Sequence, residues 1–146
     1  MEPTVFTTVA LTSLIALSNP AAKEEAKINT YTLPAIAGVW QLQAQTVCQE
    51  RYYFGADGEM RTTSDKEITQ GEYQFVYAEE ASLPVLAFNT EYDNNKPDCA
   101  GNQIDQTGHS LAVFVKLDDK HDPRHMKWCS DQEAADCNAQ LTRVLP

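Results

Sequence analysis

The sequence predicts an all-β protein, an eight-stranded up-and-down antiparallel barrel held by two disulfides. Three observations support this fold class. Apolar and polar residues alternate with a period of two in several short segments, turn-forming residues separate these segments, and none has the apolar spacing of a long amphipathic helix. Closing the last strand onto the first would remove the exposed edges of such a meander. A two-sheet β-sandwich is the alternative that the same strand pattern allows.

The predicted strands begin at Gly38, where alternation starts and continues to Thr46 with Trp40 on the side expected to be buried. The further segments are short and bounded by turn residues: 51–54, 59–64, 72–77, 85–90, 111–117, 125–129 and 138–145. Two of the turns are distinctive. Residues 55–58 (GADG) suit a tight hairpin, and residues 118–123 (DDKHDP) form a polar turn whose proline ends strand pairing.

The beginning of the chain has the features of an export signal. Residues 5–17 are an apolar run, followed by Ser18, Asn19 and Pro20 and then by small residues. The run is shorter than the about 20 residues that a membrane-spanning helix needs, but it suits a secretory signal peptide. A buried N-terminal helix is the alternative. We expect a signal peptide at residues 1–22, a tether at 23–37 and the barrel domain at 38–146, in a periplasmic or secreted protein with no stable membrane insertion after cleavage.

The four cysteines, Cys48, Cys99, Cys129 and Cys137, form an even set without the close spacing of a structural zinc site. In a small exported chain they predict two disulfides. In an up-and-down barrel, successive connections between strands alternate between the two ends. The cysteines lie in or beside connections that fall at the same end, so we expect all four at one end of the barrel. Closure would bring the end of the first strand beside the start of the last, which favours Cys48–Cys137 with Cys99–Cys129. Cys48–Cys99 with a local Cys129–Cys137 bridge is the alternative.

The composition argues against one class of partner. The chain has 21 acidic and 11 basic residues and a formal net charge of −10. The resulting field would repel phosphate backbones, so we expect no nucleic-acid partner.

No group of residues has the pattern of a catalytic centre. His121 and His125 stand beside aspartates and could be drawn as metal ligands, but a charged turn of this kind is usually solvated. His109 precedes Ser110, yet neighbours in a strand point to opposite faces. We therefore expect no enzymatic activity, no metal and no cofactor.

One pair of features resembles a known signature. Gly38-Val39-Trp40 opens the first strand and Arg143 lies near the end of the last. This is similar to the signature of the lipocalins and other calycins, in which the tryptophan of a Gly-x-Trp motif packs under the barrel and a C-terminal arginine lies across it. The resemblance implies a calycin-type barrel whose bottom is closed by Gly38, Trp40 and Arg143. Reading Trp40 as an ordinary core aromatic is the alternative.

The expected function lies at the end opposite this closed bottom. A link at residues 91–109, anchored by Cys99, exceeds the about 12 to 15 residues beyond which loops are usually functional. Side chains expected to line the interior are Tyr52, Phe54, Tyr73, Phe75, Tyr77, Leu86 and Phe88. We expect an exported, non-enzymatic protein that holds a small apolar or aromatic ligand at the barrel mouth. The alternative is a packed barrel that binds or inhibits another exported protein through its mouth loops, and a cavity above roughly 300 Å³ would favour the ligand.

Overall fold

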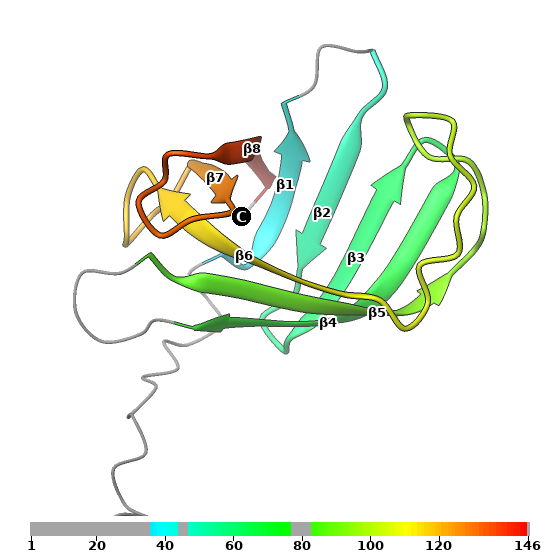
Figure 1. Ribbon diagram of the computed structural model, residues 1–146, viewed down its shortest axis with the longest axis horizontal. Helices are drawn as coiled ribbons and strands as arrows, with labels where there is room; N and C mark the ends of the chain where they lie inside the picture. The colour runs from blue at the N-terminus through cyan, green and yellow to red at the C-terminus, as the bar shows by residue number, and fades with distance from the viewer. Residues whose placement is uncertain (1–35, 44–46, 77–82, 146) are drawn as a thin grey trace, which may run out of the picture.

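The structure is a computed structural model that describes residues 36–43, 47–76 and 83–145. Its described part is all-β, with eight antiparallel strands in one closed barrel (Figure 1). The strands are β1 (Gly38–Leu42), β2 (Glu50–Phe54), β3 (Glu59–Ser64), β4 (Glu67–Val76), β5 (Val85–Asp93), β6 (Ser110–Leu117), β7 (His125–Cys129) and β8 (Cys137–Leu145). The predicted barrel is confirmed over the sandwich. The predicted signal peptide, most of the tether and residues 44–46 of the predicted first strand lie outside the described residues.

The barrel closes where β1 and β8 pair. Their register sets Trp40 opposite Arg143 and Leu42 opposite Leu141. The other neighbours in the sheet are neighbours in the chain, which is the connectivity of an up-and-down meander. Each strand therefore has a partner on both sides, and the sheet has no free edge. Among the described residues, no helix is long and apolar enough to cross a membrane.

Strand β4 begins earlier than predicted, at Glu67 and not at residue 72. The reason is a tight turn at Asp65, whose φ of 53° lies in the left-handed region, where aspartate is tolerated better than most residues. This turn sets Ser64 directly opposite Glu67. The first residues of β4 therefore lie in a segment that was predicted to be a link between two strands.

Strand β5 also extends beyond its predicted end at residue 90, to Asp93. Its pairing with β4 has a bulge at Gln70/Gly71. Gly71 lies so close to β5 that a Cβ atom there would be 1.7 Å from the carbonyl oxygen of Asn89, so only glycine fits. The link from β5 to β6 is consequently shorter than predicted and comprises residues 94–109, which we call the mouth loop.

Both turns predicted from composition are present. The Gly55 N–H donates to the Glu59 carbonyl at 2.8 Å and closes the first. In the second, the Asp118 carboxylate accepts the backbone N–H groups of His125 at 3.0 Å and Arg124 at 2.9 Å. The bonds from His125 are the main reason that the pKa of Asp118 lies well below its usual value. Asp118 thus acts as a structural cap for the turn.

Apolar side chains fill the half of the barrel near the start of β1, which we call the base. The core cluster comprises Ile36, Trp40, Phe54, Met60, Tyr73, Phe75, Leu86, Val115, Met126, Trp128 and Leu141. Burying one large side chain of this kind contributes about 1.5 to 3 kcal/mol. Among the described residues the base is therefore a packed core, and a cavity opens at the opposite end, called the mouth.

The disulfide pairing favoured from the sequence, Cys48–Cys137 with Cys99–Cys129, is wrong. The structure has the alternative, with Cα atoms 5.7 Å apart in Cys48–Cys99 and 3.8 Å apart in Cys129–Cys137. Cys129 and Cys137 lie opposite each other in the register of β7 and β8, so they join within one hairpin. The order of strands nevertheless places all four cysteines at the mouth.

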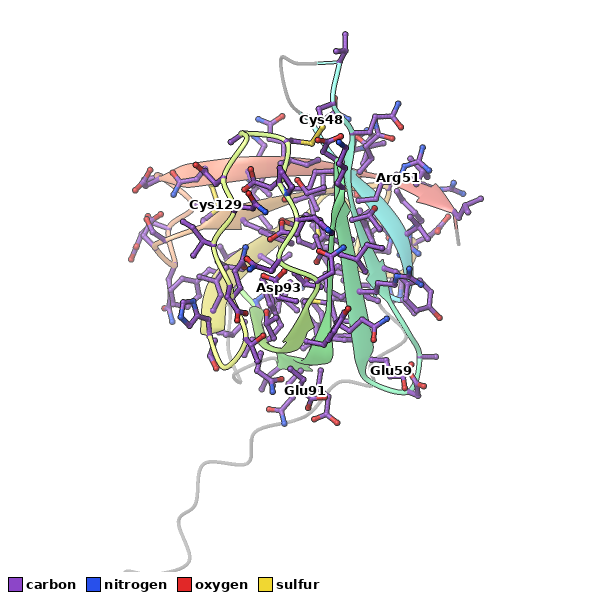
Figure 2. The ribbon with its side chains drawn as sticks, turned by 90° about the vertical axis from the view of Figure 1, so that its right-hand side faces the viewer. Cys48, Arg51, Glu59, Glu91, Asp93 and Cys129 are labelled. Carbon is purple, nitrogen blue, oxygen red and sulfur yellow. A yellow bond between two sulfur atoms is a disulfide. The ribbon has the colours of Figure 1, made fainter. Side chains whose placement is uncertain are left out.

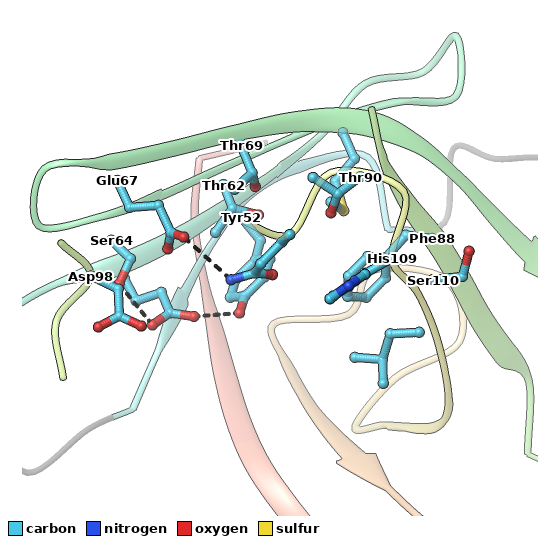
Figure 3. Close-up of a pocket in the computed structure, with 14 residues that line it drawn as sticks. Tyr52, Thr62, Ser64, Glu67, Thr69, Phe88, Thr90, Asp98, His109 and Ser110 are labelled. Atoms are coloured by element: carbon cyan, nitrogen blue, oxygen red, sulfur yellow. Dashed lines mark hydrogen bonds between the residues drawn. The ribbon is translucent and has the colours of Figure 1, made fainter. Parts of the chain in front are cut away.

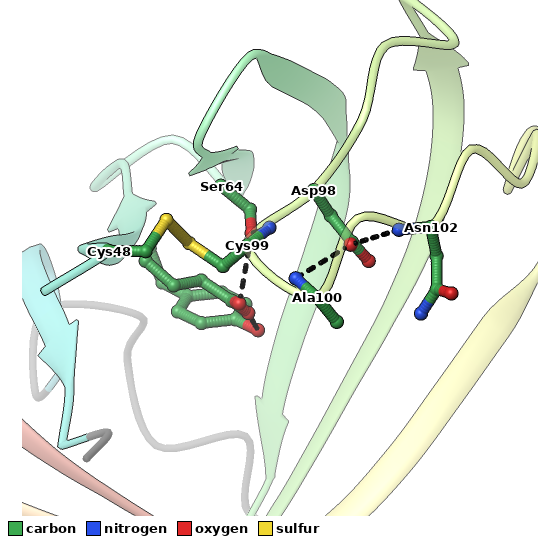
Figure 4. The surroundings of a disulfide bond; sticks show 8 residues. Cys48, Ser64, Asp98, Cys99, Ala100 and Asn102 are labelled. Atoms are coloured by element: carbon green, nitrogen blue, oxygen red, sulfur yellow. Dashed lines mark hydrogen bonds between the residues drawn. A yellow bond between two sulfur atoms is a disulfide. The ribbon is translucent and has the colours of Figure 1, made fainter. Parts of the chain in front are cut away.

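The other disulfide follows from the path of the mouth loop. The loop folds over the turn between β3 and β4, where the Pro97 carbonyl accepts the N–H of Glu67 at 3.1 Å. The Cys99 N–H donates to Ser64 Oγ at 3.0 Å, which holds Cys99 beside Cys48 (Figure 4). The positions of the strand ends alone favoured a bond between Cys48 and Cys137, but the path of the mouth loop brings Cys99 to Cys48.

Candidate functional site

A cavity of about 320 Å³ opens at the mouth, and we call it the mouth cavity (Figure 3). Strands β2 to β6 and the mouth loop supply its walls. It is lined by Glu50, Tyr52, Met60, Thr62, Ser64, Glu67, Thr69, Phe88, Thr90, Asp98, Gln106, His109, Ser110 and Leu111. Hydroxyl, carboxylate and amide groups predominate in this lining, in contrast to the apolar base.

Two of the aromatic residues predicted to line a ligand cavity do so. Tyr52 and Phe88 form part of its wall, and each contacts Trp128, with ring centres 4.8 Å and 5.9 Å away. The other described aromatic residues of the prediction, Phe54, Tyr73 and Phe75, lie in the core and are not part of the wall, and the same holds for Leu86. Tyr77 lies outside the described residues. The mouth cavity is therefore less aromatic than predicted.

Threonine hydroxyls form one wall of the mouth cavity. Thr62, Thr69 and Thr90 are only 8%, 4% and 5% exposed, and all of them line the cavity. Figure 3 shows their side chains pointing toward its interior. Within the described part of the chain, these hydroxyls have no hydrogen-bond partner. Since a hydroxyl is both donor and acceptor, they are available to a polar molecule in the cavity.

A second wall is organised around the Glu50 carboxylate. It accepts hydrogen bonds from the Tyr52 hydroxyl and from Ser64 Oγ, the latter at 3.1 Å. Ser64 in turn accepts the backbone N–H of Cys99 (Figure 4). Burial, followed by the Glu50 charge, raises the pKa of Tyr52 well above its usual value, so the phenol stays protonated as a donor. This chain of bonds connects the wall of the cavity to the disulfide.

Glu67 is the buried acid of the site, at 5% exposure. Its Oε1 accepts a hydrogen bond from Gln106 Nε2 at 3.3 Å. Burial raises the pKa of Glu67 to about 7, and the negative charges of Asp93, Asp98 and Glu50 add to the effect. Glu67 therefore changes its charge near neutral pH.

The mouth loop is held in place by aspartates. The Asp93 carboxylate accepts the N–H groups of Asn95 at 2.7 Å and Gln106 at 2.9 Å, so it ties both ends of the loop together. Asp98 Oδ1 accepts the N–H of Asn102 at 2.8 Å. Figure 2 shows the loop passing across this side of the barrel, with Asp93 beside it. These bonds and the Cys48–Cys99 bridge give the rim a defined shape.

The base carries the contact that the lipocalin resemblance implies. The Arg143 guanidinium lies 4.5 Å from the centre of the Trp40 ring, and it donates to the carbonyls of Pro123, at 2.8 Å, and Ala37. Trp40 Nε1 donates to the Ile36 carbonyl at 2.8 Å. Gly38, also predicted here, is buried at the start of β1. The base is closed by packing and hydrogen bonds together.

Sequence reasoning missed most of the polar lining, although a signal was present. On β3 the inward-facing positions change from Met60 to Ser64, and on β4 from Phe75 to Glu67, so both strands become polar toward the mouth. The alternation of buried and exposed residues continues through this change. Polar residues on an inward face predict a cavity, because a packed core would bury them without partners.

No family model matches the chain, and no curated protein and no solved structure is significantly similar to it. Kinship with the lipocalins remains a prediction that rests on Gly38, Trp40 and Arg143. The chemistry of the site is therefore inferred from its own geometry. Buried hydroxyls, a buried acid and an amide converge on a cavity with a closed base, and these groups bind small polar molecules by hydrogen bonding.

Proposed function

We propose that this protein is an exported, non-enzymatic binding protein that holds one small polar molecule in the mouth cavity. The observation that carries the proposal is the wall formed by Thr62, Thr69 and Thr90, whose side chains are buried and whose hydroxyls make no hydrogen bond to the described residues. A polar molecule in the cavity would form the missing hydrogen bonds.

The proposal replaces the apolar or aromatic ligand expected from the sequence with a polar one. Of the described aromatic side chains on which that expectation depended, Tyr52 and Phe88 keep their proposed place in the wall, and the others are in the core. Apolar ligands need predominantly apolar walls. Here the acids and hydroxyls would have to lose hydration without compensation, which disfavours a purely apolar ligand.

Size and access also support a small molecule. A volume of about 320 Å³ lies at the lower end of the roughly 300 to 1,000 Å³ typical of ligand sites. The filled base leaves the mouth as the route of entry, and the bonded mouth loop reduces the ordering entropy that binding would otherwise cost. Two disulfides agree with an oxidising, exported environment.

A second candidate function is protein binding through the rim. Ile104, on the mouth loop, is 62% exposed, and Leu111 at the start of β6 is 48% exposed. An apolar side chain on a braced loop is a suitable anchor for another protein. In this alternative the partner would cover the rim, and the mouth cavity would be incidental.

Native mass spectrometry tests the proposal on protein purified from its exported fraction without denaturation. The expected result is a mass above that of the disulfide-bonded chain. The additional mass should be below about 500 Da, because the cavity is near the lower limit of ligand sites, and it should be lost on denaturation. Thr62→Val removes one lining hydroxyl with little change in volume and should lower the retained fraction. Thr63→Val, on the outward face of the same strand, is the matched control and should retain it.

Equal retention by the Thr62 and Thr63 variants would place the small molecule elsewhere. A co-purified protein that is lost with Ile104→Ser would instead support the second candidate. The proposal would be abandoned if the native protein carries no small molecule and no water-soluble metabolite in a thermal-shift panel raises its Tm.

A further inference from the structure

We propose, building on the proposed function, that the mouth cavity selects a small organic cation, a protonated primary amine on a short aromatic or aliphatic body. Its ammonium group would lie beside Glu67 and Asp98 and the threonine wall, and its body would contact Tyr52 and Phe88. The charge, the hydrogen-bonding capacity and the shape of the cavity each support this ligand.

The charge around the cavity is negative and unbalanced. Glu50, Glu67 and Asp98 line it, and Asp93 stands close enough to Glu67 to influence its titration. None of the described residues in the lining is a lysine or an arginine, and His109 is the one lining residue that can become cationic. The ion pairs found in the described part of the chain, Arg124–Asp122 and His125–Asp118, do not involve these four acids. A cation from outside is the charge that this arrangement lacks.

The hydroxyls are an independent indication of a ligand. Thr62, Thr69 and Thr90 are each more than nine-tenths buried, face the cavity and lack a partner in the described chain. An ammonium group has three N–H donors and no acceptor, so it can bond a carboxylate and two hydroxyl oxygens at once. Carboxylate and hydroxyl oxygens on adjoining strands β3 and β4 match that requirement.

The same geometry argues against a metal ion as the cation. Among the residues that the structure describes, no three histidine, cysteine, aspartate or glutamate side chains converge as ligands of one ion. The acids instead surround a space of about 320 Å³, which is large enough for an organic molecule. Glu50 is also occupied by Tyr52 and Ser64. The acids therefore act as separate acceptors around a larger guest.

The aromatic part of the wall provides a place for the body of the ligand. Tyr52 and Phe88 are both supported by Trp128, with which they form one group of rings. An apolar or aromatic body stacked there buries surface favourably, while its charged end reaches the acids. This division into an apolar side and an acidic side favours an amine with a body over a free sugar or an inorganic cation.

Binding of a cation should be linked to protons through Glu67. The pKa of Glu67 is raised to about 7 by burial and then by Asp93, Asp98 and Glu50, which face it from β5, the mouth loop and β2. An ammonium group favours the ionised acid, so its binding releases a proton near neutral pH. His109, at the end of the mouth loop, is the histidine in the lining. Affinity should therefore rise from pH 6 to pH 8.

Isothermal titration calorimetry at pH 8 tests the inference with three probes of nearly equal size: 2-phenylethylamine, 2-phenylethanol and phenylacetate. The amine should bind, and the neutral alcohol should bind at least about tenfold more weakly, since a charge-assisted hydrogen bond is lost. The anion should not bind. For the amine, heats measured in buffers of different ionisation enthalpy should show proton release at pH 7.

Variants locate the interaction. Glu67→Gln and Asp98→Asn should each weaken amine binding about tenfold, and Glu67→Gln should also abolish most of its pH dependence. Glu72→Gln is the matched control because it lies on the same strand with its side chain exposed. His109→Asn removes the histidine from the lining and should leave the proton release through Glu67 in place. Unchanged binding in both acid variants would overturn the assignment.

The failure of this inference is distinguishable from the failure of the proposed function. If the native protein retains a neutral molecule in a manner sensitive to Thr62→Val, and the alcohol binds as well as the amine, the cavity binds ligands but does not select cations. If no probe binds and no small molecule is retained, both proposals are wrong. Amine binding that disappears in 0.5 M salt equally in all variants would be non-specific attraction to an acidic protein, and would also overturn the inference.

Discussion

Arg143 on β8 lies across the indole ring of Trp40 on β1, with its guanidinium carbon 4.5 Å from the ring centre. The two residues are opposite each other in the register that closes the barrel. The same guanidinium donates to the carbonyls of Pro123, before β7, and Ala37, before β1. One side chain therefore joins the first strand, the last strand and the turn between β6 and β7 at the base.

This contact predicts that Arg143→Ala destabilises the protein by about 1 to 3 kcal/mol, through lost packing on Trp40 and unsatisfied carbonyls. Arg143→Lys should restore only part of the loss, because an ammonium cannot reproduce the planar stacking and the divided hydrogen bonds. Urea unfolding followed by tryptophan fluorescence measures both variants. A neutral Arg143→Ala would show that β1–β8 pairing alone closes the base.

The titration of Glu67 predicts a pH-dependent stability. Its pKa is raised from 4.5 to about 7 in the folded protein, so the folded state holds the proton more tightly than the unfolded state. This group therefore stabilises the fold less as pH rises from about 4.5 to about 7, and its contribution is constant above that. The free energy of unfolding of Glu67→Gln, minus that of the native protein, should therefore be larger at pH 8 than at pH 5.

Urea unfolding at pH 5 and at pH 8 measures that difference, and Glu72→Gln on the outward face of β4 serves as the control. The Glu72 variant should differ from the native protein by the same amount at both pH values. Parallel pH profiles for the native and Glu67→Gln proteins would mean that Glu67 titrates normally.

The two disulfides are predicted to differ in their contribution. Cys48–Cys99 spans 51 residues and Cys129–Cys137 spans 8. Loop-closure entropy gives about 4 kcal/mol for the first and about 2.5 kcal/mol for the second. Replacing Cys48 and Cys99 together by alanine should thus lower the free energy of unfolding more than replacing Cys129 and Cys137.

The first double variant should also loosen the mouth loop while the base stays folded, because most of the core cluster lies toward the other end. Hydrogen exchange would show this as faster exchange at the backbone amide of residue 99, which in the native protein donates to Ser64 Oγ. Peptide mapping of the non-reduced native protein checks the pairing itself, and a Cys48–Cys137 peptide would contradict it.

The barrel could be predicted from local sequence because its strands are short, alternating and consecutive. Trp40 near the start of β1 and Arg143 near the end of β8 were expected to meet once closure was assumed, and they do. The disulfide partners could not be deduced in the same way, because four cysteines at one end allow several pairings. The choice depended on where the mouth loop folds, and that is set by bonds such as Cys99 N–H to Ser64 Oγ.

The sequence by itself determined the strand order, the inward face of each strand and the end at which the cysteines gather, since these follow from a period of two and from turn residues. Only the tertiary structure decided what the inward face encloses. Phe75 and Glu67 occupy the same face of β4, yet one is in the core and the other lines a cavity. Whether an inward position is filled or hollow depends on the side chains that meet it from other strands, and alternation along one strand does not contain that information.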